Sequence, residues 1–215
     1  MQIMGVLMKL QISFDFTDVK DALAIAEQVA DKCDIIEIDT MLLQACGAEA
    51  VREMRNRFEK KTLLVDTKLV DCAESILPIL AQAGADWITV LAGASQNAVR
   101  SICKEAQKHN LKVMLDLIDA SSKEQSALEA KTLGAHALLF HHTYDTDSSL
   151  IFLDKWQMIK ENASLPLFIS AHINRNNFDQ IVNLKPAGIV IGKSITRSES
   201  PALEAEYYYG ITSKD

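Results

Sequence analysis

The sequence predicts a single (β/α)8 barrel domain that covers residues 1–215, and three observations lead to that prediction. Short apolar runs alternate with amphipathic segments along the chain, which is typical of parallel strands joined by helices. Eight such strand–helix units fit into the 215 residues, as expected for a compact barrel of this kind. No long linker or low-complexity tract separates the units.

A doubly wound open sheet is the structural alternative. Such a sheet would normally need fewer strands, and its dinucleotide-binding form carries a G-x-G-x-x-G motif after the first strand. That motif does not follow the first predicted strand of this chain. The barrel is therefore the predicted fold.

The first unit shows how the elements are assigned. Residues 10–15 alternate apolar and polar positions as a strand does, and Thr17 or Asp18 then offers an N-cap for a helix. The other strands are expected at residues 35–40, 63–65, 87–91, 112–118, 137–142, 165–170 and 188–192. The other helices are expected at residues 47–58, 73–84, 97–109, 123–133, 150–161, 178–184 and from 201 onward. The stretch 65–71 is expected to be the end of the third strand running into a loop.

Charge and composition exclude several classes of partner. The net charge is −7 and no basic run is present, which argues against nucleic acid or an anionic membrane as the main partner. A local positive site for a small anion remains compatible with this charge. No run approaches the roughly 20 apolar residues that span a bilayer, and residues 1–9 are interpreted as a lead-in to the first strand, or an extension before a later start at Met4 or Met8.

The cysteines favour a reducing compartment. None of them forms a C-x-x-C pair, and a core-rich chain of this size does not need disulfides. We expect buried, reduced thiols in a cytoplasmic protein. The four cysteines are Cys33, Cys46, Cys72 and Cys103.

Polar residues gather where the predicted strands end. The active sites of (β/α)8 barrels lie at the C-terminal ends of the strands. Taken singly, each polar residue there is explained as well by a cap or a turn. As a set they are harder to explain in that way, because strands one, two, three and five each deliver an acid to the same end. The residues are Asp15, Glu37, Asp39, Asp66, Lys68, Asp71, Asp116, His141, His142, Ser170, His172 and Lys193.

The third strand carries the most unusual group. Asp66 and Lys68 project to the same side, because side chains alternate along a strand. Glu37 and Asp66 are candidate ligands of Mg²⁺, which prefers oxygen donors, and Lys68 is then a fixed positive charge for a developing oxyanion. The alternative is a structural ion-pair network in which Lys68 joins Asp15, Asp66 and Asp71.

Histidines offer a proton-transfer group. His141 and His142 are adjacent on a strand, so only one of them points inward. His141 is a candidate for proton transfer or substrate binding, and a satisfied core histidine is the equal alternative. With neither C-x-x-C nor H-E-x-x-H in the chain, zinc has little support.

The motif around Lys68 resembles that of a known family. Asp66-x-Lys68-x-x-Asp71 is similar to the D-x-K-x-x-D motif of the orotidine 5'-monophosphate decarboxylase suprafamily. The more similar branch holds 3-hexulose-6-phosphate synthase and 3-keto-L-gulonate-6-phosphate decarboxylase. Three further segments in the same order support the resemblance: residues 35–40 resemble V-V-E-I-G-T, residues 83–90 resemble A-G-A-D-x-I-T-V, and residues 192–201 resemble the G-R-S-I or G-G-x-I segment.

The resemblance implies a (β/α)8 barrel that forms a homodimer with sites near the interface. It implies Mg²⁺ on Glu37 and Asp66, and a 1,2-enediolate stabilised by Lys68. It also implies that Asp71 reaches the site of the partner subunit. Asp15, Asp116 and His141 match family positions that contact a phosphorylated sugar substrate or move protons. Further candidates for substrate binding are Ser170, His172, Gly192 and Lys193.

Two segments are more similar to the synthase than to the decarboxylase. Residues 115–118 resemble its V-D-M-I, where the decarboxylase has Glu in place of Asp116. Residues 141–145 resemble its H-T-G-Y-D, where the decarboxylase has Arg at Tyr144. The implied reaction is the reversible, Mg²⁺-dependent aldol addition of formaldehyde to ribulose 5-phosphate, and 3-keto-L-gulonate-6-phosphate decarboxylation is the alternative.

Three departures from the family pattern keep a second hypothesis open. Ser170-Ala171-His172 stands where the family has a Gly-Gly turn whose backbone binds phosphate, so His172 and Lys193 are expected to supply cationic contacts instead. Asp39 replaces a family Gly, and Cys72-Ala73 replaces Ala-Gly. The second hypothesis is therefore a diverged, non-catalytic member that binds a sugar phosphate or a partner protein.

Overall fold

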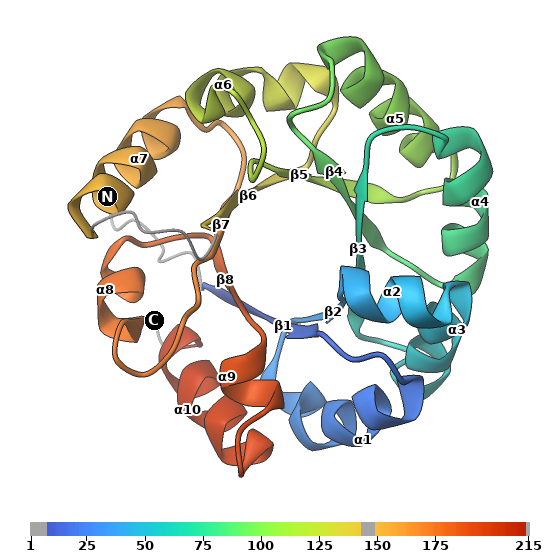
Figure 1. The fold of residues 1–215 in the computed structure, drawn as a ribbon, viewed down its shortest axis with the longest axis vertical. Helices are drawn as coiled ribbons and strands as arrows, with labels where there is room; N and C mark the ends of the chain where they lie inside the picture. The colour runs from blue at the N-terminus through green and yellow to red at the C-terminus, as the bar shows by residue number, and fades with distance from the viewer. Residues whose placement is uncertain (1–7, 143–148, 214–215) are drawn as a thin grey trace, which may run out of the picture.

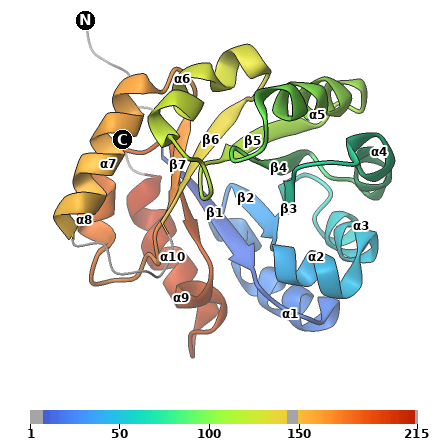
Figure 2. The same cartoon turned by 45° about the horizontal axis from the view of Figure 1, so that its top comes forward.

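Eight parallel strands close into a barrel in which the last strand, β8, pairs with the first, β1. The computed structural model describes residues 8–142 and 149–213. Helices form a ring around the barrel (Figure 1), and the turned view in Figure 2 shows them outside the strands. The strands are β1 Lys9–Phe14, β2 Ile35–Ile38, β3 Thr62–Leu69, β4 Trp87–Leu91, β5 Lys112–Asp116, β6 Ala137–His141, β7 Leu167–Ser170 and β8 Gly188–Ile191. The predicted barrel is confirmed, and the open sheet is excluded.

The helices follow the strands in alternation. Asp18 caps α1 by accepting hydrogen bonds from the backbone N–H groups of Lys20 and Asp21, which settles the choice between Thr17 and Asp18. The helices are α1 Val19–Val29, α2 Thr40–Cys46, α3 Ala48–Arg57, α4 Ala73–Ala83, α5 Gln96–Lys108, α6 Lys123–Leu133, α7 Ser149–Asn162, α8 Phe178–Asn183, α9 Lys193–Thr196 and α10 Pro201–Thr212, with a 3-10 turn η1 at Ala30–Lys32. None of the helices in the described ranges combines the length and the apolar character that a membrane crossing requires.

The structure corrects the prediction around the second and third units. A helix begins at Thr40, well before the predicted start at residue 47, and Gly47, with φ +63°, separates α2 from α3. The third strand, predicted to end within residues 65–71 and lead into a loop, extends through Asp66 to Leu69 in β3. A bulge in the pairing of β3 with β4 accompanies this extension.

Smaller corrections concern other segments. Strand β7 begins at Leu167, two residues after the predicted start, and the short helix α9 was not predicted. Cys33 and Cys103 are buried as expected, whereas Cys46 is half-buried and Cys72 is exposed; all four are free thiols. Residues 1–7 and Tyr144, which entered the sequence argument, lie outside the described residues.

The barrel interior changes from apolar to polar along the strands. One layer near the N-terminal ends is apolar and contains Ile35, Leu64, Met114, Leu139, Phe168 and Val190. Because side chains alternate, the residue two positions further along each strand points to the same interior, one layer closer to the C-terminal end. Those residues are Glu37, Asp66, Asp116, His141, Ser170 and Gly192. The larger apolar core lies between the strands and the helices, so the polar layer stands on a packed base.

Candidate active site

A cavity of about 510 Å³ opens at the C-terminal end of the barrel. Most of the sequence-predicted site residues line it: Asp15, Glu37, Asp66, Lys68, His141, Ser170, His172, Gly192 and Lys193. Asp116 is fully buried beside the cavity and contacts two of its lining residues. Asp71 is exposed and is not among the lining residues. The structure therefore brings together the predicted site residues except Asp71 and His142, the neighbour of the inward-facing His141.

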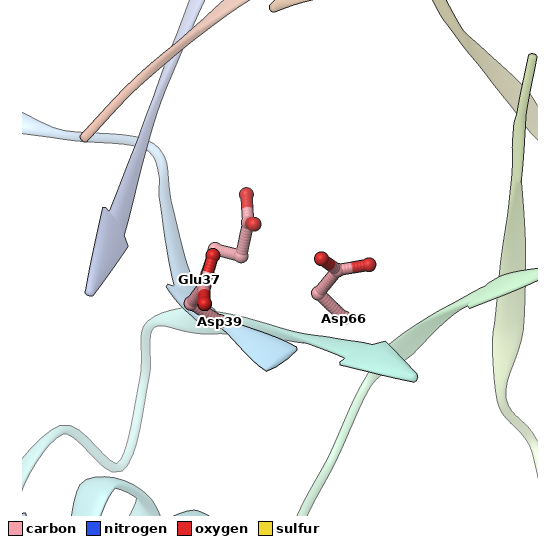
Figure 3. A group of neighbouring side chains, drawn as sticks. All are labelled: Glu37, Asp39 and Asp66. Atoms are coloured by element: carbon pink, nitrogen blue, oxygen red, sulfur yellow. The ribbon is translucent and has the colours of Figure 1, made fainter. Parts of the chain in front are cut away.

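Three carboxylates face one another where β2 and β3 end. One oxygen from each of Glu37, Asp39 and Asp66 can be chosen so that all lie within 4.8 Å of one another (Figure 3). Gln11 Nε2 donates a hydrogen bond to one oxygen of Glu37, and Ser13 Oγ donates to the other at 2.9 Å. Burial, and then the negative charge of Asp66, raise the pKa of Glu37 to about 7.

The donor set of this cluster fits a hard divalent cation. Crowded, buried carboxylates are unfavourable unless positive charge or hydrogen bonds compensate them. Burial raises the pKa of Asp39 as well, against the hydrogen bond that it accepts from the backbone of Met41. All-oxygen ligands with several negative charges are what Mg²⁺ binds in proteins. The cluster of Glu37, Asp39 and Asp66 thus includes both predicted metal ligands and adds Asp39.

Lys68 is held in an unusual backbone conformation. Its φ is +44°, in the left-handed region, which costs a non-glycine residue about 1–3 kcal/mol. Its backbone N–H donates to Thr89 Oγ1 at 2.9 Å, and its Nζ contacts Asp66 directly and lies 3.8 Å from Asp116 Oδ2. This conformation coincides with the bulge in β3 and is held by the hydrogen bond to Thr89, and Lys68 lines the cavity.

Asp66 is positioned by two hydroxyl groups that sequence reasoning missed. Thr89 Oγ1 donates to Asp66 Oδ1 at 2.6 Å, and Thr40 Oγ1 lies 2.8 Å from Asp66 Oδ2. Thr89 stands in the middle of β4, where a threonine is expected simply as a good strand former. One sequence signal could have indicated this role: Thr89 occupies a strand position that faces the barrel interior, as the other polar site residues do.

The positive groups of the site are tuned by the acids. Burial alone would lower the pKa of Lys68, but the charge of Asp66 and the hydrogen bond to it raise that pKa above its usual value. Burial likewise acts to lower the pKa of His141, and the hydrogen bond and charge of Asp116 raise it. His141 Nδ1 lies 3.2 Å from Asp116 Oδ2. Asp116 thus connects the lysine and the histidine.

The predicted ion-pair alternative is right about Asp66 and wrong about its other two partners. Within the described part of the chain, Lys68 pairs with Asp66 and Asp116, and neither Asp15 nor Asp71 lies within ion-pair distance of it. Asp15 instead lies 3.5 Å from Lys193 Nζ. The network lies in the cavity wall and is not a surface bridge.

The turn after β7 keeps a glycine-like backbone. His172 has φ +46° in the segment where the family resemblance expected a Gly-Gly turn. Its side chain lines the cavity with Lys193. Burial, and then the charges of His141, His142 and Lys193, lower the pKa of His172. The substitution of glycine has therefore added a side chain at this end of the cavity while keeping a left-handed conformation.

Comparison with known proteins identifies the family. Residues 8–208 match the Orotidine 5'-phosphate decarboxylase / HUMPS family. The chain belongs to this family. It is 30% identical over 200 residues to the 3-hexulose-6-phosphate synthase of Mycobacterium gastri, with 93% of this chain and 97% of that protein covered.

Solved structures agree with that assignment. The 3-hexulose-6-phosphate synthase from Salmonella typhimurium is 25% identical with a TM-score of 0.87, and the match covers 95% of this chain and 98% of that one. The 3-keto-L-gulonate-6-phosphate decarboxylase from Vibrio cholerae is 25% identical with a TM-score of 0.82, and covers 95% of this chain and 98% of that one. The resemblance read from the sequence, to the branch of these two enzymes, is confirmed.

Proposed function

We propose that this protein is a lyase that condenses formaldehyde with ribulose 5-phosphate, in the manner of a 3-hexulose-6-phosphate synthase. The observation that carries the proposal is Lys68, held between Asp66 and Asp116 in the wall of a cavity that also contains His141. The curated relatives reported above support the choice of substrate class. A family member that only binds would not need a strained, half-buried lysine paired with two acids.

The divalent cation would be Mg²⁺, held by Glu37 and Asp66. Gln11 and Ser13 orient Glu37, while Thr40 and Thr89 orient Asp66, so both carboxylates are placed by neighbouring elements. When bound, the cation would supply a site that chelates vicinal sugar oxygens and polarises them. All other steps are assigned to the side chains of the chain itself.

Lys68 and His141 share the proton and charge chemistry. Removal of a proton from C1 of the ketose leaves a 1,2-enediolate, whose oxyanion the Lys68 ammonium stabilises. The C1 carbon then bonds to the carbon of formaldehyde while the ketone at C2 re-forms. The oxygen of formaldehyde becomes an alkoxide and takes up a proton. His141, oriented by Asp116, moves protons in these steps. The steps balance without an oxidant or reductant.

The phosphate is assigned to the end of the cavity formed by the β7 and β8 loops. Lys193 brings an exposed ammonium, and His172, Ser170 and Gly192 line the same wall. The lowered pKa of His172 makes it a hydrogen-bonding group at neutral pH and leaves the charge to Lys193. Asp15 contacts Lys193 and sets the position of the ammonium group.

The protein is proposed to act as a cytoplasmic homodimer. Asp71 is exposed just beyond β3 and lies outside the cavity of its own chain. This position suits a residue that completes the site of a partner subunit. Mixing inactive Lys68→Ala protein with inactive Asp71→Ala protein would then restore part of the activity, because one site of each mixed dimer keeps both residues.

The test is consumption of formaldehyde by the purified protein with ribulose 5-phosphate and Mg²⁺. Turnover should require the metal and fall by roughly 100- to 1000-fold in Lys68→Ala, the effect of losing an oxyanion-stabilising group. The variant should stay folded, since Lys68 lies at the cavity wall. Near-normal turnover by Lys68→Ala would refute its role. No turnover by folded, metal-bound wild type would direct the assay to 3-keto-L-gulonate 6-phosphate, and failure there would favour the non-catalytic hypothesis.

A further inference from the structure

Asp39 carries two oxygens with different surroundings. It lies between β2 and α2, where Oδ1 accepts a hydrogen bond from the backbone N–H of Met41 at 2.8 Å as the N-cap of α2. Its other oxygen, Oδ2, lies 3.4 Å from Ser13 Oγ. Asp39 also lines the cavity, together with Glu37 and Asp66. A helix cap does not require a carboxylate that lies next to two other carboxylates, so capping alone does not explain the position of Asp39.

We propose that Asp39 is a third protein ligand of the divalent cation and that it couples the ion to the start of α2. This inference rests on the proposed function, which assigns the ion to Glu37 and Asp66 alone. Figure 3 shows Glu37 and Asp66 facing each other, with Asp39 beside Glu37 at the same end of the barrel.

The oxygen–oxygen distances in the cluster are slightly longer than those around one bound Mg²⁺. Ligand oxygens lie about 2.0–2.1 Å from Mg²⁺, so the oxygens of one octahedral ion are at most roughly 4.2 Å apart. The three carboxylates already offer oxygens within 4.8 Å of one another. Small side-chain rotations would close the remaining gap without moving the strands. Oδ1 can meanwhile stay on Met41, since the two oxygens of Asp39 serve different partners.

The charge in the cavity gives a reason for a third ligand. The phosphorylated sugar is an anion, and the cavity wall that would receive it carries Glu37, Asp39 and Asp66. If Asp39 did not bind the ion, its charge would weaken binding of the anionic substrate. As a ligand, Asp39 raises the affinity for the ion, and the occupied cluster is then less negative when the sugar phosphate arrives.

Two substitutions separate the ligand role from the cap. Asp39→Asn keeps an oxygen for Met41 and removes the charge, and Asp39→Ser keeps a good N-cap on a side chain too short to reach the ion. Calorimetric titration of the full-length protein with Mn²⁺ alone should give a Kd about ten- to one-hundredfold weaker in both variants, the range known for changes around metal ligands. Water-proton relaxation by the bound Mn²⁺ should report about one additional ion-bound water in Asp39→Ser.

Two further variants serve as references. Glu37→Gln should also weaken Mn²⁺ binding, because Glu37 is a ligand under the proposed function. Asp15→Asn removes another carboxylate of the same cavity, one that pairs with Lys193 and is not part of the cluster. The Kd for Mn²⁺ of this variant should stay within about twofold of wild type, and its number of ion-bound waters should not change.

Each outcome decides between the possibilities. A weaker Kd with an additional water in Asp39→Ser supports direct ligation. A weaker Kd with an unchanged water count overturns it and leaves Asp39 acting only through its charge, and an unchanged Kd overturns any role at the ion. If Glu37→Gln also binds Mn²⁺ like wild type, the metal site of the proposed function is itself wrong. Circular dichroism of each variant checks that α2 and the barrel are folded.

Discussion

Thr89→Val should damage both the stability and the chemistry of this protein, although Thr89 was assigned no role from the sequence. Thr89 is 1% exposed, and its hydroxyl accepts from the backbone N–H of Lys68 while donating to Asp66. Valine has nearly the same shape and an apolar group in place of the hydroxyl. The substitution therefore removes two hydrogen bonds without creating a large cavity.

The magnitude follows from the two partners left behind. An unsatisfied buried polar group costs about 1–3 kcal/mol, and the extra apolar methyl group returns about 0.8 kcal/mol. A net loss of about 2 kcal/mol in the free energy of unfolding lowers the Tm of a chain of this size by roughly 4–8 °C.

Thermal unfolding by circular dichroism measures the stability, and the formaldehyde assay measures the effect on Lys68. We expect kcat to fall by roughly ten- to one-hundredfold, as for groups that orient a functional residue, with a smaller change in KM because Lys68 acts on charge that develops during the reaction. Thr132→Val on the exposed face of α6 is the matched control, and should change the free energy of unfolding by no more than about 0.5 kcal/mol. A Thr89→Val protein with the Tm and kcat of wild type would refute the reasoning.

Two further predictions concern the wall and the base of the barrel. Asp116→Asn should lower the pKa of His141, as measured by NMR titration, because the raised pKa depends on that carboxylate. In wild type, this pair stabilises the folded state at pH values below the histidine pKa of the unfolded chain. The stabilisation is lost as the pH rises through the higher pKa of the folded state. A His141 pKa that is unchanged in the variant would contradict this assignment. Gly188→Ala should lower the Tm, because a Cβ at this position would lie 2.3 Å from Cε1 of the Phe168 ring in the barrel interior. Overpacking of this kind costs about 1–3 kcal/mol of folding free energy. An unchanged Tm would show that the ring moves aside freely.

The barrel could be predicted because the chain repeats one local signal many times. Each strand is a short apolar run, and helices such as α6 begin at a cap, Ser122, and end at Gly134 with a left-handed φ. Helix α2 could not be predicted in the same way, because its seven residues are mostly apolar and show no alternation of polar and apolar faces. Asp39 lay inside the predicted strand at residues 35–40, so its role as the cap of α2 was hidden.

The site was predicted where charge stands out and missed where polarity is ordinary. Glu37, Asp66 and Lys68 were identified because burying charge needs an explanation, and the structure gathers them in one cavity. Gln11 and Ser13 were noted only as the polar positions of an alternating strand and were assigned no role at the site. In a closed barrel ringed by helices no strand has a solvent face, so those polar positions face the interior, where both hold Glu37.

The hydrogen bonds of the cavity run from strand to strand around the barrel, and this ties the chemistry to the strand register. Residues of β1 hold Glu37 on β2, a residue of β4 holds Asp66 on β3, and His141 on β6 meets Asp116 on β5. A slip of β2 by one residue would turn the carboxylate of Glu37 toward the apolar helix layer and bring isoleucine into the cavity. Such a slip would bury a charge without partners and also lose the site. The polar layer that performs the proposed reaction is therefore also part of what selects the register of this barrel.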